Sequence, residues 1–393
     1  MKIDKKNWRH WLYLLRSAVF LVIASLLRPL MRQTQSAVLY GHKFNGNLKA
    51  FYDYYLSLPD EERHTKLVFL TLDPKYYTTA RQIEDLNGSL LYLGKFRDVL
   101  KVARSKAIIT DHGMHTLVIL NKLTNIPFID VWHGIPYKGF TPENFSFFKP
   151  YSEMWTTSKK IRELYEKLFE LDKSKIYATG YARVDAFVNN SLSRKQIIHR
   201  YGLPTKSQKF VLIAPTWQQD DKGRSIVPFG MKAKEFFELL NDTAKKHKAT
   251  IIFRAHLNAS DNIKLNKLSN VILKPYSTNP VAEDYLYISD VLITDWSSIS
   301  FDYLPLDRPT IFLNVPAPFK NGFTVGPEHR FGSIADSPDS LISQLTDAVS
   351  KPSVFMEKYR TNYDKTKSYI YGNTLDGKSA ARYYDRLKKV IGQ

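Results

Sequence analysis

The sequence contains no cysteine among its 393 residues. This absence excludes disulfide bonds, thiolate zinc sites and cysteine redox chemistry, and it fits a reducing, cytoplasmic address. Glycine-rich phosphate loops of the two standard types are also missing, which disfavours a P-loop ATPase or an ordinary dinucleotide oxidoreductase. No signature of a nucleic-acid-binding module is present. The chemistry of this chain must therefore come from individual polar residues placed by the fold.

Acidic residues are scarce relative to basic ones. Lys and Arg number 57 and Asp and Glu number 38, which gives a formal net charge of +19. Such an excess indicates anionic partners. Since no nucleic-acid module is found, we expect an anionic membrane surface and phosphate-rich substrates rather than nucleic acid. The sequence gives no indication of an oligomeric state.

A long uncharged apolar run is missing as well. In the first 33 residues the longest stretch without charge, 17–27, is shorter than the roughly 20 residues that span a bilayer. The segment carries Trp8 and Trp11 and arginines along an apolar body, which predicts an amphipathic helix lying in the membrane interface. A core or partner helix is one alternative. A secretory signal or a span is another, although no small-x-small cleavage site follows.

Beyond residue 33, short apolar strands alternate with helical segments. This alternation predicts an α/β protein of two doubly wound, Rossmann-like domains that face a cleft. The domains are expected at 34–195 and 205–370, separated by a polar linker, with a C-terminal helix in 371–393. The expected strands are 36–41, 66–72, 89–94, 106–111, 127–134, "MWTTS", "KIYATG", 209–217, 249–256, 270–275, 290–295 and 309–315.

In the first domain, histidines stand where strands are expected to end. His133 follows "FIDVW" and precedes a glycine, with Lys138 shortly after, and a neutral imidazole at such an exit suits a general base. An ordinary loop histidine is the alternative. The stretch "DHGMH" places His112 and His115 at another strand exit, but two histidines and one aspartate are weak grounds for a metal site. Arg183 lies in "TGYARVD", near the expected domain junction.

In the second domain, the strand exits carry groups suited to an anion. Arg254 and His256 are two apart in "FRAH", which on a strand places them on one face and suits them to a diphosphate. Thr216 ends the first strand of this domain, where the loop can wrap a nucleotide. The motif "TDWSSISFDY" predicts an anion site at a helix N-terminus, or alternatively a plain helix cap, formed by Asp295, Ser297 and Ser298.

Taken in order, several of these stretches resemble the CDP-glycerol glycerophosphotransferase family of teichoic acid primases and polymerases. The resemblance covers roughly Tyr40 to the C-terminus and rests on "VWHGIPYKGF", "TGYARVD", "APTW", "FRAH", "TDWSSISFDY", "DRPTIFL" and "LDGKSAARYYDRL". It implies a GT-B fold whose C-terminal helix crosses back to the first domain. It also implies peripheral, monotopic attachment to the cytoplasmic face of the membrane.

The reaction implied by the resemblance moves glycerol phosphate from CDP-glycerol to a hydroxyl of a lipid-linked or polymer acceptor and releases CMP. His133 would be the base, and His256 would join catalysis by donating to the diphosphate. The donor side would comprise Arg254, Ser297, Ser298, Asp295, Thr216 and Arg382, and the acceptor side His112, Lys138 and Arg183. No metal or cofactor is demanded, because cationic groups can neutralise the phosphates.

The sequence also departs from the family pattern. Ala255 and Leu257 flank the Arg-x-His pair where prolines are frequent, and Trp296 stands where tyrosine is common. The donor could therefore be CDP-ribitol or another CDP-alditol. The chain is expected to lack the N-terminal extension of longer polymerases, which favours a primase-like enzyme. Two other functions remain open: a GT-B glycosyltransferase using Asp295 or Asp302, and a non-catalytic adaptor for polyanions and membranes.

Overall fold

The computed structural model describes residues 7–207, 209–216, 227–254, 268–276, 279 and 281–393. The chain forms two compact units. Unit 1 comprises Met1–His133, Pro142–Asp185 and Asp376–Gln393, and unit 2 comprises Gly134–Thr141 and Ala186–Leu375. The division differs from the expected boundaries in that Gly134–Thr141, directly after His133, belongs to unit 2. The C-terminal segment Asp376–Gln393 belongs to unit 1.

Unit 1 is built on a parallel sheet of seven strands in the order β3-β2-β1-β4-β5-β6-β7. Its central strands are almost entirely buried, as expected for parallel strands that are covered on both faces. The strands are β1 (Ser36–Tyr40), β2 (Lys66–Thr71), β3 (Leu90–Tyr92), β4 (Ala107–Thr110), β5 (Phe128–Asp130), β6 (Glu153–Thr156) and β7 (Ile176–Ala178).

Helices follow the strands of unit 1 along the chain, as right-handed crossovers require. The Ser158 hydroxyl caps α7 by accepting from the Ile161 N–H at 3.1 Å. The helices are α1 (Trp8–Leu27), α2 (Gly46–Ser57), α3 (Pro74–Ala80), α4 (Phe96–Ala103), α5 (Val118–Leu123), α6 (Pro142–Phe145), α7 (Lys159–Phe169), α8 (Asp185–Val188, at the unit boundary) and α15 (Ser379–Val390).

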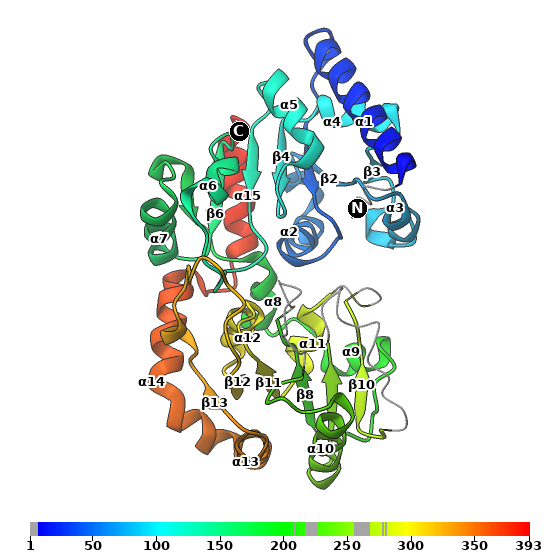
Figure 1. Cartoon of the computed structure of the whole chain (residues 1–393). Helices are drawn as coiled ribbons and strands as arrows, with labels where there is room; N and C mark the ends of the chain where they lie inside the picture. The colour runs from blue at the N-terminus through cyan, green and yellow to red at the C-terminus, as the bar shows by residue number, and fades with distance from the viewer. Residues whose placement is uncertain (1–6, 208, 217–226, 255–267, 277–278, 280) are drawn as a thin grey trace. The chain divides into compact units, whose positions relative to one another are not determined.

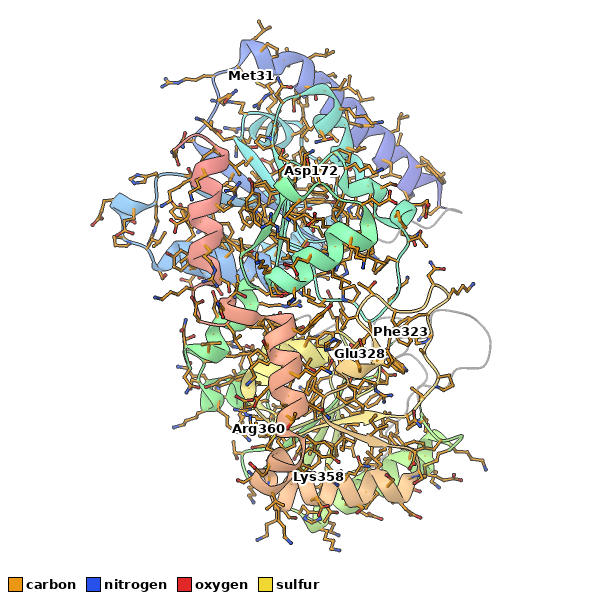
Figure 2. The ribbon with its side chains drawn as sticks, turned by 90° about the vertical axis from the view of Figure 1, so that its left-hand side faces the viewer. Met31, Asp172, Phe323, Glu328, Lys358 and Arg360 are labelled. Atoms are coloured by element: carbon orange, nitrogen blue, oxygen red, sulfur yellow. The ribbon has the colours of Figure 1, made fainter. Side chains whose placement is uncertain are left out.

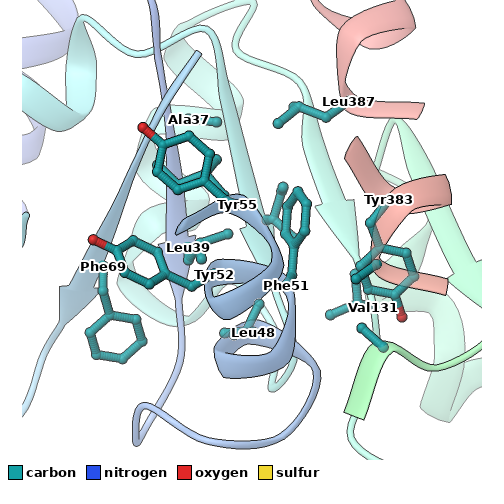
Figure 3. Close-up of a cluster of buried hydrophobic side chains, with 14 of the residues drawn as sticks. Ala37, Leu39, Leu48, Phe51, Tyr52, Tyr55, Phe69, Val131, Tyr383 and Leu387 are labelled. Carbon is teal, nitrogen blue, oxygen red and sulfur yellow. The ribbon is translucent and has the colours of Figure 1, made fainter. Parts of the chain in front are cut away.

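The C-terminal helix α15 is part of the core of unit 1 (Figure 3). Its Tyr383 is fully buried and lies with its ring centroid 5.7 Å from that of Phe51 on α2 and 4.9 Å from that of Trp155 on β6. The Arg386 guanidinium donates to both carboxylate oxygens of Glu153. Residues near the C-terminus therefore complete a core that the first half of the chain begins.

Unit 2 has a parallel sheet of six strands in the order β10-β9-β8-β11-β12-β13. The short strand β13 was not among the expected strands. The elements of unit 2 are β8 (Lys209–Ile213), β9 (Ala249–Phe253), β10 (Val271–Leu273), β11 (Val291–Thr294), β12 (Thr310–Leu313), β13 (Ser333–Ala335), α9 (Arg194–Arg200), α10 (Ala233–Lys246), α11 (Glu283–Ile288), α12 (Ile299–Tyr303), α13 (Pro338–Ser350) and α14 (Pro352–Ile370).

Both sheets have the strand order of a doubly wound Rossmann-like fold, which confirms the predicted fold class. One predicted strand end was wrong. Strand β9 ends at Phe253 and not at residue 256, so Arg254 comes after the strand. The reason is that the apolar run stops at Phe253, whereas the sequence reading extended the strand over the polar residues beyond it. His256 itself lies outside the described residues.

Helix α1 lies along unit 1 beside α4 and α5 (Figure 1). Leu21 and Ala24 are fully buried, the Tyr13 hydroxyl donates to the Leu72 carbonyl at 2.6 Å, and Arg28, just beyond the helix, donates to the Ser105 carbonyl. The opposite face is apolar and exposed, and it consists of Trp8, Trp11, Leu12, Leu15, Val19, Val22, Ile23, Leu26, Leu27 and Leu30. We call these ten residues the apolar stripe.

Within the part of the chain that the structure describes, the segment Trp8–Leu30 is one helical stretch long and apolar enough to cross a membrane by length and composition. It is longer than the uncharged run in the sequence because it includes Arg9, Arg16 and Arg28. Figure 2 marks Met31 just beyond its end.

Candidate functional site

The turn after β5 in unit 1 presents His133. Asp130 ends the strand, is fully buried, and accepts from the Trp132 N–H at 2.8 Å and the Thr110 hydroxyl at 3.0 Å. Trp132 has a φ of 49°, a strained conformation for a residue with a side chain, and Gly134 has a φ of 153°. Burial raises the pKa of Asp130 to about 8, against the opposing effect of these two hydrogen bonds. The aspartate thus fixes the sharp turn that precedes the histidine.

Three consecutive carbonyl groups of this turn are also held. The Asn47 side-chain amide donates to the Val131 and Trp132 carbonyls, both at 3.1 Å. The Arg183 guanidinium donates to the His133 carbonyl at 2.9 Å, and the Arg183 backbone N–H donates to the Asn47 side-chain oxygen at 3.2 Å. The backbone under His133 is therefore rigid, as a catalytic group requires.

The hydrogen bond made by the His133 ring assigns its tautomer. Nδ1 lies 2.9 Å from the Asp111 carbonyl oxygen, which can only accept, so Nδ1 carries the proton and the neutral ring keeps its lone pair on Nε2. The pKa of His133 lies well below its ordinary value, because of desolvation first and the neighbouring His112 second. The His133 residue is exposed to solvent, which limits the desolvation of its ring. Of the two causes of the lowered pKa, the repulsion from His112 is therefore the one that the geometry supports directly. A neutral, exposed imidazole of this kind can accept a proton near neutral pH.

The three acceptor-side residues have different placements. His112 stacks on His133 with ring centroids 4.3 Å apart. Arg183 lies under the same turn, where it supports the backbone. Lys138 belongs to unit 2, where its backbone forms an antiparallel bridge with Phe323 and its carbonyl accepts from the Thr324 hydroxyl. The structure therefore brings His112 and Arg183 to His133, and places Lys138 in the other unit.

Arg254 is a buried cation at the carboxyl end of β9 in unit 2. Only 6% of it is exposed, and its guanidinium lies over the rings of Tyr276 and Tyr285, 5.6 and 5.3 Å from their centroids. Neither Nη atom has a hydrogen-bond partner among the described residues. Burial lowers the pKa of Arg254. A desolvated guanidinium without a partner is costly, and an anionic ligand would supply the missing acceptors.

Strand β8 is the neighbour of β9 in the sheet and β11 is the next strand, and beyond the ends of these two strands Thr216 and Asp295 come together. Asp295 is buried, and its Oδ1 accepts from the Thr216 N–H at 2.7 Å, from the Thr216 hydroxyl, and from the Trp296 N–H at 2.6 Å. These bonds fix the two loops against each other. Asp295 therefore fixes the backbone of the candidate donor side through these hydrogen bonds.

The paired serines differ in role. Ser297 has its hydroxyl 3.5 Å from the Ile299 N–H and its carbonyl bonded to Ser300, so it shapes the start of α12. Ser298 occupies the N-cap position of α12, but its side chain makes no capping hydrogen bond. The helix has only five residues, so its dipole adds less than a longer helix would. The Ser298 hydroxyl is therefore the group of this motif best placed for a ligand.

We expect Ser298→Ala to leave the melting temperature unchanged, because no cap bond is lost, and to weaken donor binding by about tenfold, the effect of one hydrogen bond. Ser158→Ala is the matched control, because that hydroxyl does cap a helix, and it should cost about 1 kcal/mol of stability. Thermal melts and donor titrations of both variants measure this. A lower melting temperature with unchanged donor affinity in Ser298→Ala would show that this serine caps the helix and does not bind the donor.

Arg382, expected at the donor phosphates, is placed in unit 1 on α15. Its Nη1 donates to both carboxylate oxygens of Asp376, at 2.8 and 2.9 Å, and its Nε donates to the Thr179 carbonyl at 2.7 Å. Gly180, with a φ of 85°, lies so close that an added Cβ would come within 2.2 Å of the Ser379 hydroxyl. In the described structure Arg382 thus ties the "TGYARVD" turn to the C-terminal helix.

Some residues of the site carry no signal in the sequence. Asn47 and Asp130 hold the His133 turn through contacts made only by the folded chain. Arg330 is a second buried guanidinium of unit 2, lying 4.5 Å from the ring centroid of Trp296 and donating to the Leu313 carbonyl at 2.8 Å. Arg330 follows the short turn Pro327–His329, which carries no motif that would predict this placement. Among the described residues, no three His, Asp or Glu side chains are grouped to hold a metal.

These features define an α/β protein of GT-B type, with two Rossmann-like sheets and polar groups at the carboxyl ends of the strands. The chain belongs to the CDP-Glycerol:Poly(glycerophosphate) glycerophosphotransferase family, whose model matches residues 21–389.

Similar proteins agree with this assignment. A teichoic acid poly(glycerol phosphate) polymerase of Staphylococcus epidermidis is 29% identical over 306 residues, which are 70% of this chain and 40% of that protein. A teichoic acid glycerol-phosphate transferase of Staphylococcus aureus is 25% identical, over 89% of this chain and 91% of that protein. The solved structure of the wall teichoic acid polymerase TagF has a TM-score of 0.76 at 19% identity, and 99% of each chain is covered.

Proposed function

We propose that this chain transfers glycerol phosphate from CDP-glycerol to a hydroxyl group of a lipid-linked or polymeric acceptor in teichoic acid synthesis. Family membership supports the donor and the reaction class. The similarity to the Staphylococcus aureus transferase extends over nearly the whole of both chains, which supports the same conclusion.

In this reaction, Nε2 of His133 takes the proton of the acceptor hydroxyl as its oxygen attacks the β-phosphorus of the donor. A bond forms between that oxygen and phosphorus, the bond from phosphorus to the bridging oxygen breaks, and CMP leaves with the electron pair. Little covalent work is asked of the protein, so positioning and charge neutralisation supply most of the rate. Arg254 and the Ser298 hydroxyl would bind the diphosphate, and Asp295 would hold the loop of Ser298 against the loop of Thr216.

The observation that carries this proposal is the Arg254 guanidinium. It is desolvated, stacked on two tyrosine rings, and has no hydrogen-bond partner at either Nη among the described residues. A surface ion pair does not explain such a group, because no carboxylate among those residues pairs with it. A diphosphate offers the paired acceptor oxygens that match a guanidinium fork.

Product analysis with the purified chain tests the function. CDP-glycerol, CDP-ribitol and a UDP-sugar are each offered with a short lipid-linked acceptor, and release of CMP or UDP is followed together with the product mass. We expect CMP and an added polyol phosphate. UDP release with an added sugar would favour a glycosyltransferase, and no turnover with any donor would favour a binding protein. One added unit would indicate a primase, and a ladder would indicate a polymerase.

The chain would act as a peripheral protein at the cytoplasmic face of the membrane, and α1 supports this part of the proposal. Its inner face contacts unit 1 near its start, middle and end, through Tyr13, Phe20 and Arg28, while the apolar stripe is exposed along its whole length. A helix packed lengthwise on its own domain is suited to lie in the interface rather than to cross the bilayer. Tryptophans at one end and flanking arginines suit headgroup depth and anionic lipid.

We expect the double variant Leu15→Glu and Leu26→Glu to bind anionic vesicles about 100-fold or more weakly, because each leucine would lose about 1.5–3 kcal/mol of apolar burial. Both side chains are exposed, so the fold should persist. Val354→Glu, at a valine that is 67% exposed on α14, is the matched control and should bind normally. Vesicle sedimentation measures both. Wild-type binding by the double variant would contradict the interfacial role of α1.

A further inference from the structure

Four imidazole rings gather at the carboxyl ends of three neighbouring strands of unit 1. His42 follows β1, His112 and His115 follow β4, and His133 follows β5. The His42 ring centroid lies 5.0 Å from that of His112 and 4.9 Å from that of His115. The rings of His112 and His133 are stacked at 4.3 Å with their planes 10° apart. We call these two residues the histidine pair.

One residue holds both members of the pair. The Asp111 Oδ1 atom lies 2.7 Å from Nδ1 of His112, and the Asp111 backbone carbonyl accepts from Nδ1 of His133 at 2.9 Å. Asp111 is buried, with 3% of its surface exposed, and an alanine in place of neighbouring Gly41 would bring its Cβ within 3.0 Å of that carboxylate. The side chain of Asp111 therefore pairs with the His112 ring, and its backbone carbonyl sets the His133 ring.

We propose that His112 is a positioning residue for His133: its stacked ring fixes the plane of the base, and its positive charge, held by Asp111, keeps the base neutral. The proposal rests on the proposed function, since it assumes that His133 is the base. It goes further by giving the adjacent histidine a defined part in the same reaction. His112 itself need not touch the substrate.

The charges around the pair agree with this division of roles. The Asp111 carboxylate outweighs desolvation and raises the pKa of His112. Desolvation and then the charge of His112 lower the pKa of His133. As pH falls, His112 is therefore protonated first, and a second proton on its stacked neighbour is opposed by like charge.

The other titratable groups facing the pair come from different elements of unit 1. Desolvation and then His112 lower the pKa of His42 to about 3, and the same two causes lower that of His115, so neither adds positive charge near neutral pH. Burial raises the pKa of Asp130, which makes it a weak counter-charge. The groups are Asp111 after β4, Asp130 at the end of β5, Arg183 on the turn Ala182–Val184, His42 after β1, and His115 at the start of the turn His115–Leu117.

A metal or a purely structural cluster explains these contacts less well. No metal-holding group is found among the described residues, and His112 presents Nδ1 to a carboxylate and its ring face to His133. A structural role alone would not require a carboxylate at Nδ1 of the ring that stacks on the base. The distinguishing property is the effect of His112 on the protonation of His133.

Histidine NMR titration of the full chain, labelled at the imidazole carbons, tests the proposal. His133→Gln identifies the His133 signal. In His112→Gln, which keeps a polar group near Asp111 but loses the charge, the pKa of His133 should rise by about one unit or more. The acid limb of the kcat profile should move to higher pH by the same amount. His115→Gln is the matched control, because His115 does not contact His133, and it should leave this pKa unchanged.

A second variant, His112→Phe, keeps a stacked ring without charge and should give the same shift. An unchanged pKa of His133 in both His112 variants, each confirmed as folded by its remaining histidine signals, would overturn the proposal. The titration needs no turnover, so it is independent of the donor. Absence of CMP release would count against the proposed function alone, whereas turnover with an unmoved pKa would count against His112 alone.

Discussion

His133→Ala is expected to lower kcat by about 10²–10⁴-fold, the usual contribution of a positioned general base. Donor binding should change little, because in the proposed mechanism the lone pair on Nε2 serves the acceptor hydroxyl rather than the diphosphate. The fold should also persist. The turn is held by the side chains of Asp130, Asn47 and Arg183, which do not depend on the imidazole.

Single-turnover rates with the natural acceptor, together with a donor titration, measure this effect. His199→Ala is the matched control, since that histidine is exposed on α9 in unit 2 and should keep wild-type rates. His133→Ala with a wild-type kcat would remove His133 as the base and, with it, the assignment of the unit 1 site. A large loss of donor affinity with unchanged kcat would instead move His133 to the donor side.

The fold was largely predictable because its strands are short, fully buried apolar runs between polar turns. Such runs are typical of central strands of a parallel sheet, and "KLVFLT" and "DVLIT" were located almost to the residue. The three-residue β13 was missed, because its sequence "SIA" has too little length or pattern to mark a strand. Strand ends were less predictable, since β5 stops at Asp130 and β9 at Phe253, short of the expected ends at 134 and 256.

The site was predictable only where its residues closely follow strands. Arg254 and Asp295 come directly after β9 and β11, and His133 comes three residues after β5, and that position is what marked them. Asn47 could not be found this way, because its partners Val131 and Trp132 lie more than 80 residues further along the chain. Arg382 was expected near phosphates, but its bonds to Asp376 and Thr179 depend on how α15 packs in unit 1. Long-range hydrogen bonds of this kind leave no periodic or local signal.

Arg254→Met is expected to weaken donor binding by about 100-fold while leaving the melting temperature equal or higher. A hydrogen bond to a charged group contributes about 1.5–3 kcal/mol, so the loss of a guanidinium fork accounts for this loss of affinity. Stability should not fall, because no described residue pairs with either Nη atom and a buried cation carries a desolvation cost that methionine does not. Methionine also keeps the contact of the side chain with the two tyrosine rings.

Calorimetric titration with CDP-glycerol and thermal melts of the same preparations separate the two effects. Arg200→Met is the matched control: its guanidinium pairs with Asp284 at 3.0 Å, its side chain is 61% exposed, and its loss should change neither quantity by much. A fall of several degrees in the melting temperature of Arg254→Met, with donor affinity intact, would mean that this guanidinium has a structural partner. Gain of stability together with loss of donor affinity is the pattern of a residue retained for its ligand, and it is the result that we expect.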